Sequence, residues 1–132
     1  MIITLKTASQ VTELQLVQSD GNVLTTDTWE SGRLLSTQLL EHISGLLGQQ
    51  RTTWDALTGV VVFRGPGSFT GLRIGVTVAN AIAYAQEIPI VGAIGDSWVS
   101  AGLKRLADGA TDTQVLPHYG AAPHITKPKG SA

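Results

Sequence analysis

The chain contains no cysteine among its 132 residues. This absence excludes disulfide bridges, thiolate zinc sites and a thiol nucleophile. Charge is also scarce, because Asp, Glu, Lys and Arg together make up 14% of the residues, against about 25% in an average soluble protein. A chain with so little charge is expected to cover part of its surface with another protein.

Neither sign of charge dominates, since the net charge is −1 and the isoelectric point about 6.2. The chain as a whole therefore lacks the electrostatic footprint of a nucleic-acid-binding protein. No apolar run approaches the roughly 18 residues of a membrane span, and residues 1–6 are too short and too polar for a signal peptide. With 42% hydrophobic residues, we expect a soluble cytoplasmic protein with a single core and no membrane contact.

Apolar periodicity divides the chain into strands and helices. Alternation and β-branched residues predict strands, Asp20-Gly21 marks a hairpin between two of them, and spacings of three and four predict helices. The predicted strands cover 2–6, 11–18, 23–29, 57–63 and 90–94, and the predicted helices cover 33–47, 70–86 and 98–107. The order βββαβαβα predicts an α/β fold with a mixed five-stranded sheet.

The regular pattern ends near residue 109. We therefore predict one lobe over residues 1–109 and a Pro-rich, irregular tail over residues 110–132, where three of the five prolines lie. The tail is expected either to lie on the lobe or to be disordered.

Small residues recur every four positions along the helix at 70–86, at Gly71, Gly75, Ala79 and Ala83. Such a ridge allows another backbone to approach closely. Packing of the chain's own two long helices on each other and on the sheet explains the ridge about as well. The low charge content favours an interface with another chain, for which we predict nine residues: Leu35, Leu39, Ile43, Gly71, Arg73, Gly75, Ala79, Asn80 and Ala83.

A glycine-rich turn, which we call the motif turn, joins the strand at 57–63 to this helix. It consists of Gly65, Pro66, Gly67, Ser68, Phe69 and Thr70. Unpaired N–H groups at a helix N-terminus can bind an anion, and the same geometry can serve close packing. The turn lacks the lysine and spacing of a P-loop and the GxGxxG of a dinucleotide site. We therefore favour a packed turn with Ser68 or Thr70 as the helix cap.

Arg73 lies in the first turn of the helix, where its charge opposes the helix dipole. It is therefore expected to meet a carboxylate or a phosphate, unless it accepts a small energetic penalty. His42, His118 and His124 do not have metal-ligand spacing, and a Ser68 nucleophile would need a base that the sequence does not reveal. We predict no catalytic residues and no metal site. A nucleotide-binding or peptidase-like enzyme centred on Ser68 and Arg73 is kept as an alternative.

The stretch from Gly65 to Val76 resembles the bacterial TsaB (YeaZ) family, and so do Ile88-Pro-Ile-Val-Gly92 and Asp20-Gly-Asn-Val-Leu24. The resemblance covers residues 1–107 and implies the N-terminal lobe of an actin/Hsp70-like (ASKHA, RNase H-like) fold. It implies a non-catalytic scaffold in the synthesis of tRNA threonylcarbamoyladenosine (t6A). Such scaffolds pair through two helices with a TsaD/Kae1-like enzyme or with themselves. A TsaE-like ATPase and tRNA would be reached only through the complex.

The chain departs from the family pattern at several positions. Lys6 stands where an acidic residue is usual, and Leu35-Ser36 replaces a His-Ser pair. The lysine argues against Mg-ATP chemistry, so we expect no cofactor. The segment Leu116–Pro123 resembles the family's closing segment, with Ala121 in place of an arginine. The chain therefore looks like a reduced form without most of the second lobe, and half of the superfamily's ATP cleft would be missing.

Overall fold

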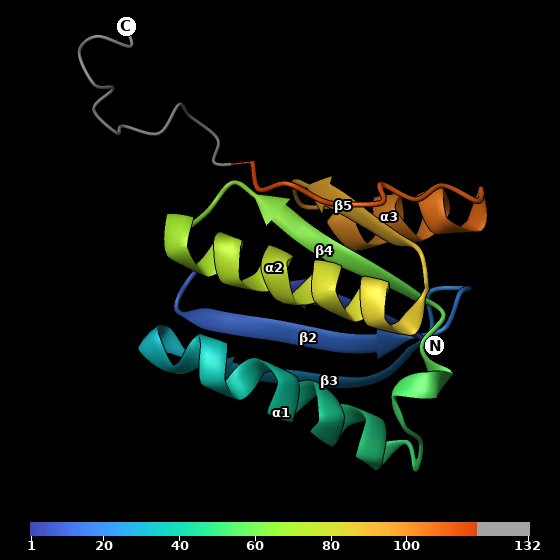
Figure 1. The fold of residues 1–132 in the computed structure, drawn as a ribbon, viewed down its shortest axis with the longest axis horizontal. Coiled ribbons are helices and arrows are strands. Elements are labelled where there is room, and N and C mark those ends of the chain that lie inside the picture. Colours follow the sequence, from blue (N-terminus) through green and yellow to red (C-terminus); the bar gives the residue numbers. More distant parts are fainter. Residues whose placement is uncertain (119–132) are drawn as a thin grey trace, which may run out of the picture.

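The computed structural model describes residues 1–118, which form a five-stranded sheet covered by helices (Figure 1). The elements are β1 (Ile2–Lys6), β2 (Val11–Val17), β3 (Val23–Glu30), the short 3-10 helix η1 (Gly32–Leu34), α1 (Leu35–Gln49), η2 (Trp54–Ala56), β4 (Gly59–Gly65), α2 (Phe69–Gln86), β5 (Ile90–Ile94) and α3 (Trp98–Ala107).

The strand order across the sheet is β3-β2-β1-β4-β5. β1, β2 and β3 form an antiparallel meander, whereas β4 runs parallel to β1 and β5 parallel to β4. Parallel neighbours need a crossover connection, and α2 supplies it between β4 and β5. The expected α/β fold with a mixed five-stranded sheet is confirmed.

Helices cover both faces of the sheet. α1 and α2 lie side by side on one face, and α3 lies behind the β4–β5 half (Figure 1). Alternate residues of each strand point to opposite faces, so the hydrophobic core has two parts. Ile3, Leu5 and Val62 contribute to the cluster under α1 and α2. Ile2 and Val61 contribute to the cluster under α3.

Several boundaries differ by one or two residues from the sequence-based prediction. β4 begins at Gly59 and continues through Gly65, and α2 begins one residue early, at Phe69. α1 continues to Gln49 instead of ending at residue 47. The helix ends there because Arg51, with a φ of 54°, takes the left-handed position that a glycine often fills after a helix.

The first part of the predicted tail is packed on the lobe. Residues 111–118, which we call the strap, belong to no helix or strand but run back beside β5 (Figure 1). Residues 119–132, including His124 and Ala121, lie outside the described residues, and the division at residue 109 stays a prediction.

Candidate functional site

The motif turn lies between the end of β4 and the start of α2. Gly65 has a φ of 135°, which L side chains rarely adopt, and its bond to Pro66 is cis. The Ser68 hydroxyl accepts a hydrogen bond from the Gly71 N–H at 3.4 Å, while the Ser68 N–H donates to the Ala8 carbonyl at 2.7 Å. Ser68 is therefore the cap of α2, as one of the two alternatives predicted.

Close contacts with residues 7–8 explain the glycines of the motif turn and of α2 at positions 67, 71 and 75. A Cβ atom at Gly67 would lie 2.5 Å from the Ala8 Cβ, and one at Gly71 would overlap the Thr7 carbonyl oxygen. A Cβ at Gly75 would overlap the Thr7 hydroxyl, which itself donates to the Gly71 carbonyl at 2.7 Å. The glycines of α2 therefore accommodate residues 7–8 of the same chain. This corrects our assignment of the ridge at these two positions to another chain's backbone.

Most of the nine residues predicted for a partner interface lie inside the lobe. Six of them are buried, namely Leu35, Leu39, Ile43, Gly75, Ala79 and Ala83, and the five other than Gly75 are 5% exposed or less. They pack between the two helices and the sheet. The alternative of internal packing accounts for them, and pairing with a partner stays a prediction that must rest on other residues.

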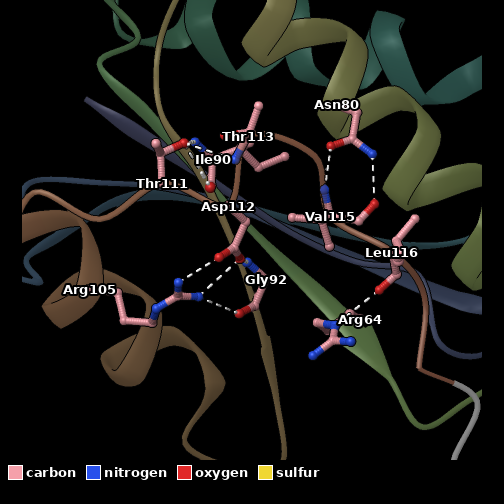
Figure 2. Close-up of polar contacts among 10 residues, drawn as sticks. All are labelled: Arg64, Asn80, Ile90, Gly92, Arg105, Thr111, Asp112, Thr113, Val115 and Leu116. Carbon is pink, nitrogen blue, oxygen red and sulfur yellow. Dashed lines mark hydrogen bonds and ion pairs between the residues drawn. The ribbon is translucent and has the colours of Figure 1, made fainter.

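Asn80, another of the nine, contacts the strap. Its amide nitrogen donates to the Val115 carbonyl at 2.9 Å, and its amide oxygen accepts from the Val115 N–H at 2.9 Å (Figure 2). Both ends of the amide are therefore used within the chain, and the assignment of Asn80 to a partner interface stays a prediction. The sequence offered no periodic signal for this contact, because the two residues are 35 positions apart.

What remains exposed between α1 and α2 is a groove. One section, of about 400 Å³, is lined by Ser36, Thr70, Arg73, Ile74, Thr77 and Val78. A second section, of about 550 Å³, continues past Thr70 and Ile74 to residues 9–10, 32–33 and the motif turn. The Arg73 guanidinium lies 5.7 Å from the centre of the Phe69 ring. This stacking places Arg73 on an aromatic ring of its own helix, a contact that the sequence argument did not consider.

The strap is fixed by an ion pair at its start (Figure 2). Arg105 donates to the Asp112 carboxylate at 3.0 and 2.5 Å, and the Gly92 N–H donates to the same carboxylate at 2.8 Å. The hydrogen bonds from Arg105 hold the pKa of Asp112 below its usual value, and the pKa of Arg105 is raised in turn. Sequence reasoning missed this cluster, which joins α3, β5 and the strap.

Two further polar contacts concern residues that the sequence analysis singled out. His42 Nδ1 lies 2.7 Å from an Asp27 carboxylate oxygen, and its ring stacks on Trp29 at 3.6 Å between centroids. The Lys6 ammonium lies 4.6 Å from the centre of the Phe63 ring. Within residues 1–118, no three His, Asp or Glu side chains gather as a metal site would require, and no helix there is long and apolar enough to cross a membrane.

The sequence is similar to those of two groups of known proteins. The profile of the family described as "TsaD: tRNA N6-adenosine threonylcarbamoyltransferase" matches residues 29–93. The tRNA threonylcarbamoyladenosine biosynthesis protein TsaB of Bacillus subtilis is 40% identical over 55 residues, which are 42% of this chain and 24% of that protein. The tRNA N6-adenosine threonylcarbamoyltransferase of Latilactobacillus sakei is 53% identical over 45 residues, 34% of this chain and 13% of that protein.

A solved structure matches more of the chain. YeaZ from Pseudomonas aeruginosa superposes with a TM-score of 0.61 and 26% identity over 70% of this chain and 44% of that one. The fold is thus the ASKHA-like lobe of the YeaZ structure. The chain is therefore similar to TsaB proteins in sequence and to YeaZ in structure. The match spans under half of the YeaZ chain and about a quarter of the Bacillus protein.

Proposed function

We propose that the chain is a non-catalytic scaffold in t6A synthesis, and that its α1–α2 surface pairs with a TsaD/Kae1-like enzyme. A TsaE-like ATPase and tRNA would then be reached through the complex, in the cytoplasm. The names of the relatives support a role in this modification. The observation that supports pairing is the exposed groove between the two long helices.

Large apolar side chains are exposed on the same helices and at their ends. The exposed fractions are 56% for Leu34, 53% for Leu40 and 44% for Phe69. Apolar residues gathered on one surface often mark a protein-binding site. A groove between two parallel ridges of side chains suits the packing of further helices. The low charge content of the whole chain agrees with a surface that a partner covers.

The alternative was an enzyme centred on Ser68 and Arg73. The contacts of these residues within the chain favour the non-catalytic role. The Ser68 hydroxyl accepts the Gly71 N–H and so serves as the helix cap. Arg73 stacks on Phe69. The Lys6 ammonium, near the end of β1, lies over the Phe63 ring, and we propose that the chain alone binds no ATP.

Exposed positions allow a direct test, whereas Ala79 is fully buried and unsuitable. Thr77→Arg places a long cation in the α1–α2 groove, where Thr77 is exposed. Ala101→Arg adds the same side chain at an exposed position of α3, on the other face of the sheet. Calorimetry with a TsaD-like protein from the same genome should show at least tenfold weaker binding for Thr77→Arg and unchanged binding for Ala101→Arg.

The outcome separates the alternatives. Equal affinity of both variants, with unchanged melting temperatures, would show that the groove is not the partner surface. If no complex forms, but sedimentation shows a homodimer that Thr77→Arg dissociates, the same surface pairs two copies of the chain and the scaffold proposal fails. ATP binding or hydrolysis that Ser68→Ala abolishes would instead favour the enzyme.

A further inference from the structure

The strap is bound to the lobe by backbone hydrogen bonds and by individual side chains, in the manner of a peptide bound to a receptor. It follows α3 through residues 108–110, where Gly109 has a φ of 84°. Its backbone then bonds to the lobe at separate points. The Asp112 N–H donates to the Ile90 carbonyl at 2.7 Å. Arg64 Nε donates to the Leu116 carbonyl at 3.0 Å, and the His118 N–H donates to the Arg64 carbonyl at 2.6 Å.

Two strap side chains are recognised individually. The Asp112 carboxylate accepts from the Gly92 N–H and from Arg105. Val115 is 3% exposed and belongs to the core cluster under α1 and α2. Thr113 and Gln114, between them, are exposed. The groove that holds the strap therefore binds a carboxylate side chain and a valine side chain, and the two residues between them remain exposed to solvent.

The groove that receives the strap, which we call the strap groove, is built from α2, β4, β5 and α3 (Figure 2). It is lined by Asn80, Arg64, Ile90, Gly92 and Arg105. Removing the strap would leave the Asn80 amide, the Gly92 N–H and the Ile90 carbonyl without the partners described above. An edge strand with unpaired backbone groups readily accepts an extended segment, and strand edges with side-chain pockets bind peptides in this way.

We propose that the strap groove is a peptide-recognition site for an extended Asp-x-x-Val segment, and that residues 111–118 of a second copy of the chain occupy it when the chain's own strap leaves. Exchange of an identical segment between two copies needs only a hinge that can open, here residues 108–110. The chain's own strap competes from a short tether, which gives it an effective concentration of about millimolar. Exchange is therefore expected when the strap is weakened or the chain is concentrated.

Two full-length variants test the exchange by complementation. The strap variant, Asp112→Ala with Val115→Ala, keeps an intact groove. The groove variant, Asn80→Ala with Arg105→Ala, keeps an intact strap. Mixing them should give a 1:1 complex in sedimentation at concentrations at which neither variant alone associates. Pairing through the α1–α2 surface would act in each variant alone, so the two kinds of dimer are distinguishable.

A labelled synthetic peptide with the sequence of residues 109–118 gives the affinity directly. It should bind the strap variant, and a peptide with alanine in place of Asp112 should bind at least tenfold more weakly, because a charge-assisted contact is lost. The groove variant and a Gln114→Ala chain, whose own strap is intact, should not bind it. If the double strap variant does not fold, the single Asp112→Asn variant replaces it.

A folded strap variant that binds neither the peptide nor the groove variant overturns the proposal. Equal binding of the two peptides also overturns it, because the Asp112 carboxylate would then contribute nothing to recognition by the groove. These results leave the pairing of the α1–α2 surface with a TsaD-like protein untouched, since that test uses Thr77, which lines the α1–α2 groove and has no contact with the strap described here.

Discussion

Gly71→Ala tests whether the glycines of α2 serve packing within the chain. An added Cβ would lie closer to the Thr7 carbonyl oxygen than the 3.0 Å that real Cβ atoms respect, and the obstacle is backbone. The change should also disturb the hydrogen bond from the Thr7 hydroxyl to the Gly71 carbonyl. Overpacking costs about 1–3 kcal/mol and a lost hydrogen bond about 1 kcal/mol.

Alanine's higher helix propensity offsets about 0.5–1 kcal/mol of this cost. The net loss is therefore about 1–3.5 kcal/mol, or about 4–14 °C in melting temperature at roughly 4 °C per kcal/mol for a domain of this size. The matched control is Gly45→Ala in α1, because a Cβ there would meet nothing within 4 Å. It should raise the melting temperature by about 2–4 °C, since only the propensity gain remains.

Thermal and urea unfolding of both variants measure the two effects, and calorimetry with the partner measures binding. If Gly71→Ala melts like the wild type but loses the partner, the packing argument is refuted. Gly71 would then face another chain, as the small-residue pattern alone suggested.

Three other changes probe the strap and the motif turn. Asn80→Ala should lower the free energy of unfolding by about 2–3 kcal/mol in urea, because both backbone groups of the buried Val115 lose their partners. Asp112→Asn should destabilise the chain at neutral pH. The lowered pKa of Asp112 makes its contribution present above the unfolded pKa of about 4 and lost as the pH falls through the folded value. The difference in melting temperature from wild type should therefore shrink below about pH 4, and a constant difference would contradict the role of Arg105. Gly65→Ala should reduce soluble yield or melting temperature more than Gly45→Ala does, because its φ is 135° and a strap carbonyl occupies the space.

Local periodicity was sufficient to predict the elements of the lobe. Strand residues such as Val60, Val61 and Val62 are buried on both faces of the sheet, and such runs are typical of central parallel strands. α1 and α2 also follow their apolar spacing. These predictions depend on residues close together in the sequence, where pattern and structure are directly related.

The assignment of residues to a partner surface depended on distant contacts, and there the sequence was insufficient. A small-residue ridge shows that something approaches closely, but not what. The approaching residue is Thr7, 64 positions before Gly71. The amide of Asn80 likewise recognises backbone atoms of Val115, which any residue type would present. The remaining signals in the strap were an isolated carboxylate and a valine after Gly109, and neither has a characteristic spacing.

The chain is similar both to TsaB proteins and to the threonylcarbamoyltransferases. The shared core of the lobe explains this double similarity. The matched residues 29–93 contain α1, β4, α2 and most of β5, so they include most of the buried cluster that packs the helices on the sheet. Any protein that builds this lobe needs such a cluster, whatever it binds. Exposed positions such as Leu40, Thr77 and Tyr84 are not constrained by it, and substitutions there usually change stability by less than about 0.5 kcal/mol. Partner choice can therefore differ between lobes of the same fold, and under the pairing proposed above the exposed surface of α1 and α2 would decide it.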